Sequence, residues 1–419
     1  MNEHIKQRIT QLNNGEAPSG YKKTEFGVFP CDWSPKTIGE VSTEKGCYGL
    51  NAPACNYEEG LPKYLRITDI DENGNYLNND AYVNHKDSKN YMLQENDIVF
   101  ARTGASVGKN YLYSSKDGEL SYAGFLIKFS IDETKCVPYM VKANCRGNRY
   151  DKWVQIMSAR SGQPGINAEE YADFSLMIPN DLKEQSKIAE ILMKWDEAIE
   201  LQEQYIGTLE NRKKFLMKKL LTSKGNWRSV KLGKIAEMYA GGTPSTQKSE
   251  YWGGEIPWIQ SGLIQNGYID IENIDGRITE EGLKKSSATW IAKNSVLVAI
   301  TGATCANIAY LRCDATANQS VISITTNTVD SLFLYFYLQS TRNKLLSLQN
   351  GSAQGGLTLK YLQNFEIMYP ELSVQKKIGS ILSNVDVEIS MQKDIVLKLK
   401  NQRKALQQYL LNGIVRVNK

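Results

Sequence analysis

Two long segments of the chain, residues 178–222 and 369–412, carry hydrophobic residues three, four and seven positions apart. This spacing places the hydrophobic side chains on one face of a helix. Identical residues recur between the two segments at a constant offset of 190, beginning with Gln185 and Gln375. The match indicates an internal repeat whose two copies are both helical. In the first copy, Asp181 and Glu184 have the spacing of a capping box at the helix start.

The later part of each segment has the pattern of a coiled-coil helix. Its apolar positions are 7, 3, 7 and 4 residues apart, as in a heptad repeat, and each seam is interrupted at equivalent positions by Lys213 and Arg403. Asp196 and Asp386 are candidates to cap a second helix of about 26 residues, which would be about 39 Å long. Because an isolated helix with an apolar stripe is marginal in water, we expect antiparallel pairing rather than two unrelated core helices. The seam residues are Ile199, Ile206, Leu209, Leu216 and Leu220 in the first copy and Ile389, Val396, Leu399, Leu406 and Leu410 in the second.

A longer block precedes each helical segment and is rich in short β-branched and aromatic runs separated by Gly, Asn and Pro. This pattern predicts mixed α/β domains with many short strands. The two blocks share short motifs, such as A-R-T-G-A at 101–105 and A-I-T-G-A at 299–303. We therefore expect an α+β protein in which two mixed α/β domains are separated by two long antiparallel helices with pseudo-two-fold symmetry. The predicted parts are an N-terminal arm (1–30), a first domain (31–180), a central spacer helix (181–224), a second domain (225–370) and a C-terminal helix with its tail (371–419).

Composition narrows the class of protein. The net charge of +4 is too small to indicate a nucleic-acid binder by itself. The seven cysteines include no C-x-x-C pair and the chain has only two histidines, so we expect free thiols and no metal site. No apolar run approaches the roughly 18–20 residues that cross a bilayer, and the first residues lack the apolar core of a secretory signal. A cytoplasmic protein is expected.

No catalytic motif is convincing. The segment T-G-A-S-V-G-K-N (103–110) is similar to a phosphate-binding loop, but Gly104 and Gly108 are one residue too close and Asn110 replaces the Ser or Thr that holds magnesium. A hairpin turn explains it better. With His4 and His85 as the only histidines, Ser-His and Cys-His catalysis also lack support. The chain is therefore expected to catalyse no reaction by itself.

Several motifs in order along the chain resemble those of a type I restriction–modification specificity subunit. They are G-Y-K-K-T-E-F-G-V-F-P-C-D-W (20–33), R-T-G-A (102–105), E-Q-S-K-I-A-E-I-L (184–192), G-G-T-P-S (241–245) and Y-W-G-G-E-I-P-W-I (251–259). The chain departs from the family at Val374, where a Glu usually precedes the residue equivalent to Gln375. The resemblance covers essentially the whole chain.

The resemblance implies a non-catalytic DNA-recognition subunit. Each globular domain would be a target-recognition domain for one half of a bipartite DNA site, and the unequal domains imply an asymmetric target. The helices would set the spacing and dock two modification subunits, which use S-adenosylmethionine to methylate adenine. Restriction subunits that use ATP and Mg²⁺ would complete the complex.

Base readout requires amides, hydroxyls and guanidinium groups at the groove edges. Arg66 and Arg102 fit this need, although a structural ion pair explains either one equally well. The tryptophans Trp33, Trp227 and Trp258 are expected in the core rather than on the DNA. The predicted DNA-binding residues are Arg66, Arg102, Thr103, Lys109, Arg160 and Gln163 in the first domain and Thr243, Ser245, Gln260, Ser261, Thr301 and Gln354 in the second.

Two other functions remain open on the sequence alone. A standalone regulator or architectural DNA-binding protein would use the same two domains and spacer. The recognition half of a fused methyltransferase–nuclease would need a catalytic domain, whose motifs this sequence lacks. Co-purification with two copies of a methyltransferase distinguishes a specificity subunit from both.

Overall fold

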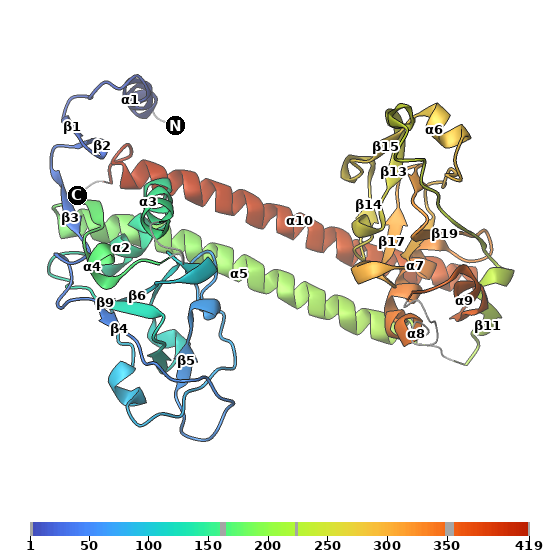
Figure 1. Ribbon diagram of the computed structural model, residues 1–419, viewed down its shortest axis with the longest axis horizontal. Coiled ribbons are helices and arrows are strands. Elements are labelled where there is room, and N and C mark those ends of the chain that lie inside the picture. The colour runs from blue at the N-terminus through green and yellow to red at the C-terminus, as the bar shows by residue number, and fades with distance from the viewer. Residues whose placement is uncertain (1–2, 160–164, 223–224, 348–355, 418–419) are drawn as a thin grey trace. The chain divides into compact units, whose positions relative to one another are not determined.

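The computed structural model describes residues 3–159, 165–222, 225–347 and 356–417 (Figure 1). The chain forms two compact units. Unit 1 comprises Met1–Leu201 together with Val396–Lys419, and unit 2 comprises Gln202–Ile395. Each unit therefore combines one globular domain with parts of both long helices. Mixed α/β domains and two long helices confirm the predicted fold class.

Unit 1 is built around a four-stranded antiparallel sheet. Its central strand β6 is fully buried, because every residue of D-I-V-F-A lies between packed layers. The strand order is β4 (Cys47–Tyr48), β9 (Leu126–Ser130), β6 (Asp97–Ala101) and β7 (Asn110–Leu112). Three two-stranded pairs surround it: β1 (Tyr21–Thr24) with β2 (Gly27–Pro30), β3 (Trp33–Thr37) with β10 (Ser175–Pro179), and β5 (Lys63–Leu65) with β8 (Leu120–Tyr122). The short helices are α1 (Glu3–Asn13), α2 (Pro138–Asn144), α3 (Asn148–Ser158) and α4 (Ala168–Ala172).

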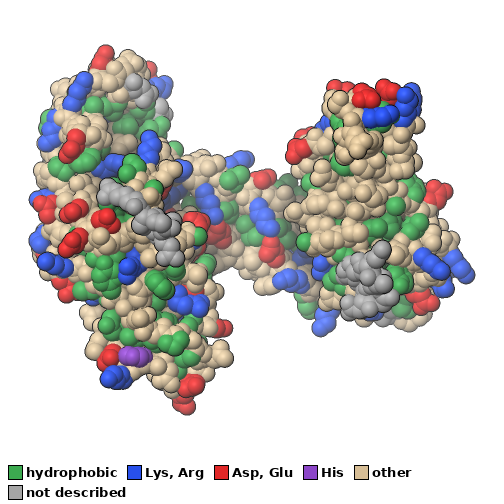
Figure 2. Space-filling view, in the orientation of Figure 1, with side chains coloured by type: hydrophobic (Ala, Val, Ile, Leu, Met, Phe, Trp, Pro, Cys, Tyr) green, Lys and Arg blue, Asp and Glu red, His purple; other side chains and the backbone are tan. Residues whose placement is uncertain are grey.

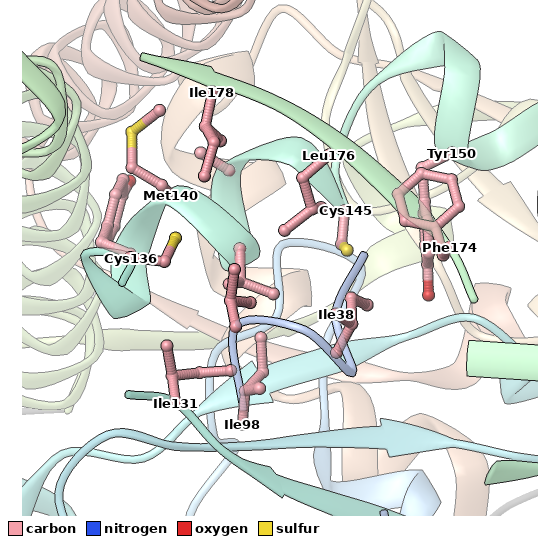
Figure 3. Close-up of a cluster of buried hydrophobic side chains, with 14 of the residues drawn as sticks. Ile38, Ile98, Ile131, Cys136, Met140, Cys145, Tyr150, Phe174, Leu176 and Ile178 are labelled. Atoms are coloured by element: carbon pink, nitrogen blue, oxygen red, sulfur yellow. The ribbon is translucent and has the colours of Figure 1, made fainter. Parts of the chain in front are cut away.

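The main core of unit 1 lies between this sheet, α2 and the β3–β10 pair. Figure 3 shows Met140 of α2, and Cys136 just before this helix, in the same cluster as Ile98 of β6 and Ile178 of β10. Trp33 is fully buried in this core, as expected from the sequence.

Unit 2 repeats this plan with a larger sheet. Its five strands follow the order β12 (Glu237–Ala240), β19 (Val321–Thr325), β16 (Val296–Ala299), β17 (Ile308–Leu311) and β14 (Tyr268–Ile269). A second sheet contains β15 (Arg277–Ile278), β13 (Trp252–Ile259) and β18 (Thr316–Ala317), and β11 (Arg228–Lys231) pairs with β20 (Glu366–Tyr369). Its short helices are α6 (Glu280–Lys284), α7 (Ser331–Ser340), α8 (Arg342–Ser347) and α9 (Leu359–Asn364). Trp258 is buried in this unit.

The two long helices are α5 (Leu182–Leu220) and α10 (Leu372–Leu411). Each is continuous, so the expectation that a second helix begins at Asp196 or Asp386 is wrong. No proline interrupts either helix, and both aspartates lie inside it. Their carboxylates serve the pairing of the helices instead, because Asp196 binds Arg403 in unit 1 and Asp386 binds Lys213 in unit 2.

The helices pair antiparallel in each unit. In unit 1 the contacts of α5 advance from Glu184 to Asp196 while those of the C-terminal segment run back from Arg416 to Arg403. In both units the side chains of the predicted seam residues are buried or half-buried. Ile199, Ile206, Leu209, Ile389, Val396 and Leu410 are buried, and Leu216, Leu220, Leu399 and Leu406 are half-buried.

The repeated glutamines perform the same task in both units. The side chain of Gln185 accepts a hydrogen bond from the backbone N–H of Val137 and donates one to the carbonyl of Pro179. Gln375 makes the equivalent bonds to Asp330 and Pro370. Both amides are buried, so each glutamine ties its helix start to its domain through otherwise unsatisfied backbone groups.

Glu184 does not close the predicted capping box. Its carboxylate, which is almost fully buried, lies 2.7 Å from Nε of Arg416, and Arg416 also binds Asp32. The repeat equivalent of Glu184 is Val374, which carries no charge. At the start of α10, this position therefore cannot form the ion pair that Glu184 forms at the start of α5.

Candidate nucleic-acid interface

Equivalent turns connect the central strands of the two sheets. The turn between β6 and β7 contains the 3₁₀ helix η3 (Gly104–Ser106), and the turn between β16 and β17 contains η9 (Gly302–Thr304). Gly104 and Gly302 have φ angles of 69° and 70°, in the left-handed region that favours glycine. The structure thus confirms a hairpin in place of a phosphate-binding loop. Thr103 and Thr301 precede these turns and are half-buried and exposed, respectively.

Arg66 has a structural ion pair. Its Nε and Nη2 donate hydrogen bonds of 2.9 and 2.8 Å to the two carboxylate oxygens of Asp69, which is completely buried. Burial acts to raise the pKa of Asp69, but hydrogen bonds from Arg66 and Asn79 outweigh it and hold this pKa below its ordinary value. The fork of Arg66 is therefore already occupied by a carboxylate.

Arg102 has a different environment. Its guanidinium carbon lies 4.7 Å from the ring centroid of Tyr48, and its Nε is buried without a hydrogen-bond partner. None of the carboxylates in the described residues forms an ion pair with it. Of the two arginine candidates that the structure describes, Arg66 and Arg102, Arg102 is thus the one whose fork no carboxylate of the described residues occupies.

Lys109 anchors a neighbouring loop. Its Nζ lies 2.7 Å from Oε1 of Glu72 and 3.3 Å from the carbonyl oxygen of Ile70. These contacts explain the residue without DNA, and its role in DNA contact stays a prediction.

The candidates of unit 2 lie on exposed loops beside its sheets. The hydroxyl of Thr243 donates a hydrogen bond to the side chain of Gln319. Ser245 and Gln260 are exposed, and Ser261 begins the 3₁₀ helix η7 (Ser261–Leu263). Whether these four residues contact DNA stays a prediction. Arg160, Gln163 and Gln354 lie outside the described residues.

Two exposed aromatic residues near Arg102 escaped the sequence analysis. Tyr48 is 43% exposed and Phe125 is 57% exposed. Aromatic residues are more typical of a core than of a surface, so the residue types of Tyr48 and Phe125 gave no signal. A comparison of the two sequence copies could have found them, since Ala240 and Ser320 occupy the equivalent positions.

The described residues contain no group of three or more His, Cys, Asp or Glu side chains placed to hold a metal ion. All seven cysteines are free thiols. No helix in the described ranges is long and apolar enough to span a membrane. Figure 2 shows basic and acidic side chains interspersed on the visible face of each unit, which agrees with the small net charge.

Comparisons with known proteins agree with this arrangement. The family model described as type I restriction modification DNA specificity domain matches residues 30–211 and again residues 224–401. The putative type I restriction enzyme MjaX specificity subunit of Methanocaldococcus jannaschii is 25% identical over 95% of this chain and 97% of its own length. The EcoR124I/EcoR124II specificity subunit of Escherichia coli is 28% identical over 48% of this chain and 52% of its own length.

Solved structures share the fold at lower sequence identity. The S subunit of a type I restriction–modification system from M. genitalium has a TM-score of 0.60 at 15% identity and covers 90% of this chain and 96% of its own. A chain from a study of complex assembly in the type I restriction–modification system has a TM-score of 0.56, also at 15% identity, and covers 92% of this chain and 99% of its own. The family match disfavours a standalone regulator. Because it covers both copies of the repeat and most of the chain, this protein belongs to the type I restriction–modification DNA specificity family.

Proposed function

We propose that this chain is the subunit that selects the DNA target of a type I restriction–modification complex, and that it catalyses no step itself. Each unit binds one half of a bipartite site. The observation that carries this proposal is the presence of two family domains in one chain, on the same framework but with different exposed side chains. Different surfaces on the two units support an asymmetric target.

The long helices supply docking surfaces for two copies of one partner, an adenine methyltransferase subunit. Leu201 and Met391 occupy equivalent positions of the repeat and are 59% and 60% exposed. Tyr205 and Ile395 are also equivalent and are 43% and 41% exposed. Large apolar side chains at equivalent exposed positions favour two similar contacts. S-adenosylmethionine is expected on these partners, and ATP and Mg²⁺ on restriction subunits.

Domain exchange tests the recognition role. The chain is co-expressed with its methyltransferase, and methylated sites are mapped by sequencing before and after residues 31–180 are replaced by the corresponding block of another family member. We expect one half of the target to change and the other half to persist. A change in both halves would contradict independent recognition by the two units.

Substitution of the exposed apolar residues tests docking. Leu201→Asp together with Met391→Asp should prevent assembly with the methyltransferase while the chain keeps its melting temperature. Leu209→Asp is a less selective variant, because Leu209 is buried in the helix pair and its loss disrupts the chain itself. Glu59→Lys, at an exposed position of unit 1 outside the long helices, serves as the control and should leave assembly intact.

A further inference from the structure

Tyr48, Arg102 and Phe125 lie on one face of the sheet of unit 1. Tyr48 pairs with Ile127 across β4 and β9, and Phe100 pairs with Ile127 across β6 and β9. Arg102 and Phe125 lie just beyond β6 and β9. The hydrogen bond from the N–H of Arg102 to the carbonyl of Phe125 continues the pairing of these strands, and the guanidinium of Arg102 lies over the ring of Tyr48. The three residues therefore form one cluster beside the turn at Gly104, in which Tyr48 and Phe125 are exposed and Arg102 is half-buried.

Main-chain and side-chain contacts fix the positions of this cluster. The backbone N–H of Arg102 donates to the carbonyl of Phe125 at 3.0 Å, and its own carbonyl accepts from Ile166 at 2.9 Å. The hydroxyl of Tyr48 accepts a hydrogen bond of 3.3 Å from the backbone N–H of Ala168, at the start of α4. Tyr48 is thus held as a platform on which the guanidinium of Arg102 rests.

Unit 2 has the same scaffold with other side chains. Ile300 donates its N–H to the carbonyl of Ser320 and accepts from Leu357, so Ile300 and Ser320 are the equivalents of Arg102 and Phe125. The N–H of Gly241 bonds to Val321 as that of Gly49 bonds to Leu126, which makes Ala240 the equivalent of Tyr48.

Two domains that read different bases need different side chains on a common framework. The turns keep Thr103 and Thr301 as well as Gly104 and Gly302, whereas all three cluster positions change. The turn is thus retained while the three side chains beside it differ between the units.

We propose that Arg102 binds a guanine edge in the half-site of unit 1, with Tyr48 fixing the plane of its guanidinium and Phe125 packing against the neighbouring base pair. This inference rests on the proposed function. A fork that no carboxylate occupies matches the O6 and N7 acceptors of guanine in the major groove. Because Nε is buried, the two terminal nitrogens Nη1 and Nη2 make this contact. Stacking on Tyr48 reduces the entropy that the long side chain loses on binding.

The test uses the full chain in complex with its methyltransferase subunits. The target is first defined by methylation sequencing in cells. Binding of the purified complex is then measured by competition against duplexes in which each base pair of the first half-site is changed in turn. The native complex should prefer one G·C pair by roughly 5- to 150-fold, as one bidentate arginine–guanine contact provides. Arg102→Lys keeps the charge but removes the fork, so it should lose this preference at that position alone.

Control variants separate this role from others. Arg66→Lys alters an arginine that is already paired with Asp69 and should keep the base preferences of the native chain. Tyr48→Ala should reduce the preference at the same position as Arg102→Lys. If Arg102→Lys weakens binding to every duplex equally, Arg102 contacts a phosphate and the proposal is overturned. Base preferences that Arg102→Lys leaves unchanged would also overturn it, as would dissociation of the methyltransferase subunits from this variant. If the native complex methylates no bipartite site, the proposed function itself fails.

Discussion

Nε of Arg403 donates a hydrogen bond of 2.8 Å to Oδ1 of Asp196, between α10 and α5 in unit 1. The repeat equivalents of these residues, Lys213 and Asp386, form an ion pair of 2.6 Å in unit 2. A tyrosine of each domain also binds the carboxylate: Tyr139 in unit 1 and Tyr268 in unit 2. The interruptions of the two apolar seams are therefore matched polar contacts that fix the register of the helices.

Removal of one partner of the pair in unit 2 should destabilise that unit. In Lys213→Met, the carboxylate of Asp386, which is 11% exposed, loses its cation and keeps the hydrogen bond from the hydroxyl of Tyr268. Loss of one partner of a buried pair costs about 3 kcal/mol. We expect calorimetry to show a lower melting temperature for unit 2. Lys214→Met, at the exposed neighbouring position, should leave it unchanged, and equal melting of both variants would show that the pair contributes nothing.

A double substitution in unit 1 should reproduce the solution found in unit 2. Arg416→Asn leaves the buried carboxylate of Glu184 without its cation and should lower the melting temperature of unit 1. The added change Glu184→Val introduces the residue that unit 2 has at Val374 and should recover most of the loss, because it removes the buried charge. A double variant that melts no higher than Arg416→Asn would contradict this equivalence of the two units.

The repeat, the helix pairing and the strand-rich domains were predictable because periodicity and self-similarity are properties of the sequence itself. The ion pair of Asp196 was not predictable, because its partner Arg403 is 207 residues away in the sequence and comes close only when the helices pair. The prediction that Asp196 caps a helix used the local sequence alone, and for that reason it was wrong. Tyr48, in a two-residue strand, and Phe125, in a turn, were missed because hydrophobic periodicity in such short segments does not reveal which side chains are exposed.

Lys142 makes the stability of unit 1 depend on pH. Burial, with a smaller contribution from the nearby Arg146, lowers the pKa of Lys142 from 10.5 to about 7. Between these values the unfolded state binds more protons than the folded state, so the free energy of unfolding rises with pH. Below pH 7 both states are protonated and the penalty of the buried charge is fully present.

Lys142→Met removes this penalty. The variant should exceed the native chain in melting temperature most clearly at pH 7 and below, and the difference should shrink as the pH approaches 10. Thermal unfolding of both proteins across this range measures the difference directly. A constant difference at all pH values would show that the amine keeps its ordinary pKa in the folded unit.

The charges on the helices favour α5 paired with α10 over two copies of α5. In unit 2, Nζ of Lys393 lies 2.8 Å from Oε1 of Glu210. A fragment ending at Lys224 retains the seam of α5, which should drive pairing with a second copy. In a pair of two α5 helices, Glu203 takes the place of its repeat equivalent Lys393. Glu210 of each copy then faces Glu203 of the other, so two like-charge contacts form. Lys213 meets Asp196 instead of Asp386, and this contact keeps its opposite charges.

Glu203→Lys in this fragment should therefore tighten its dimer. Each exposed contact changes from repulsion to attraction and contributes about 0.5 kcal/mol, so the two together give roughly a fivefold lower dissociation constant. Sedimentation equilibrium at low and high salt measures it, and the gain should fade as salt screens the charges. Glu197→Lys makes the same change of charge at another exposed position of α5 and should have a smaller effect. Equal effects of the two variants would show that net charge, rather than the contact with Glu210, governs which helices pair.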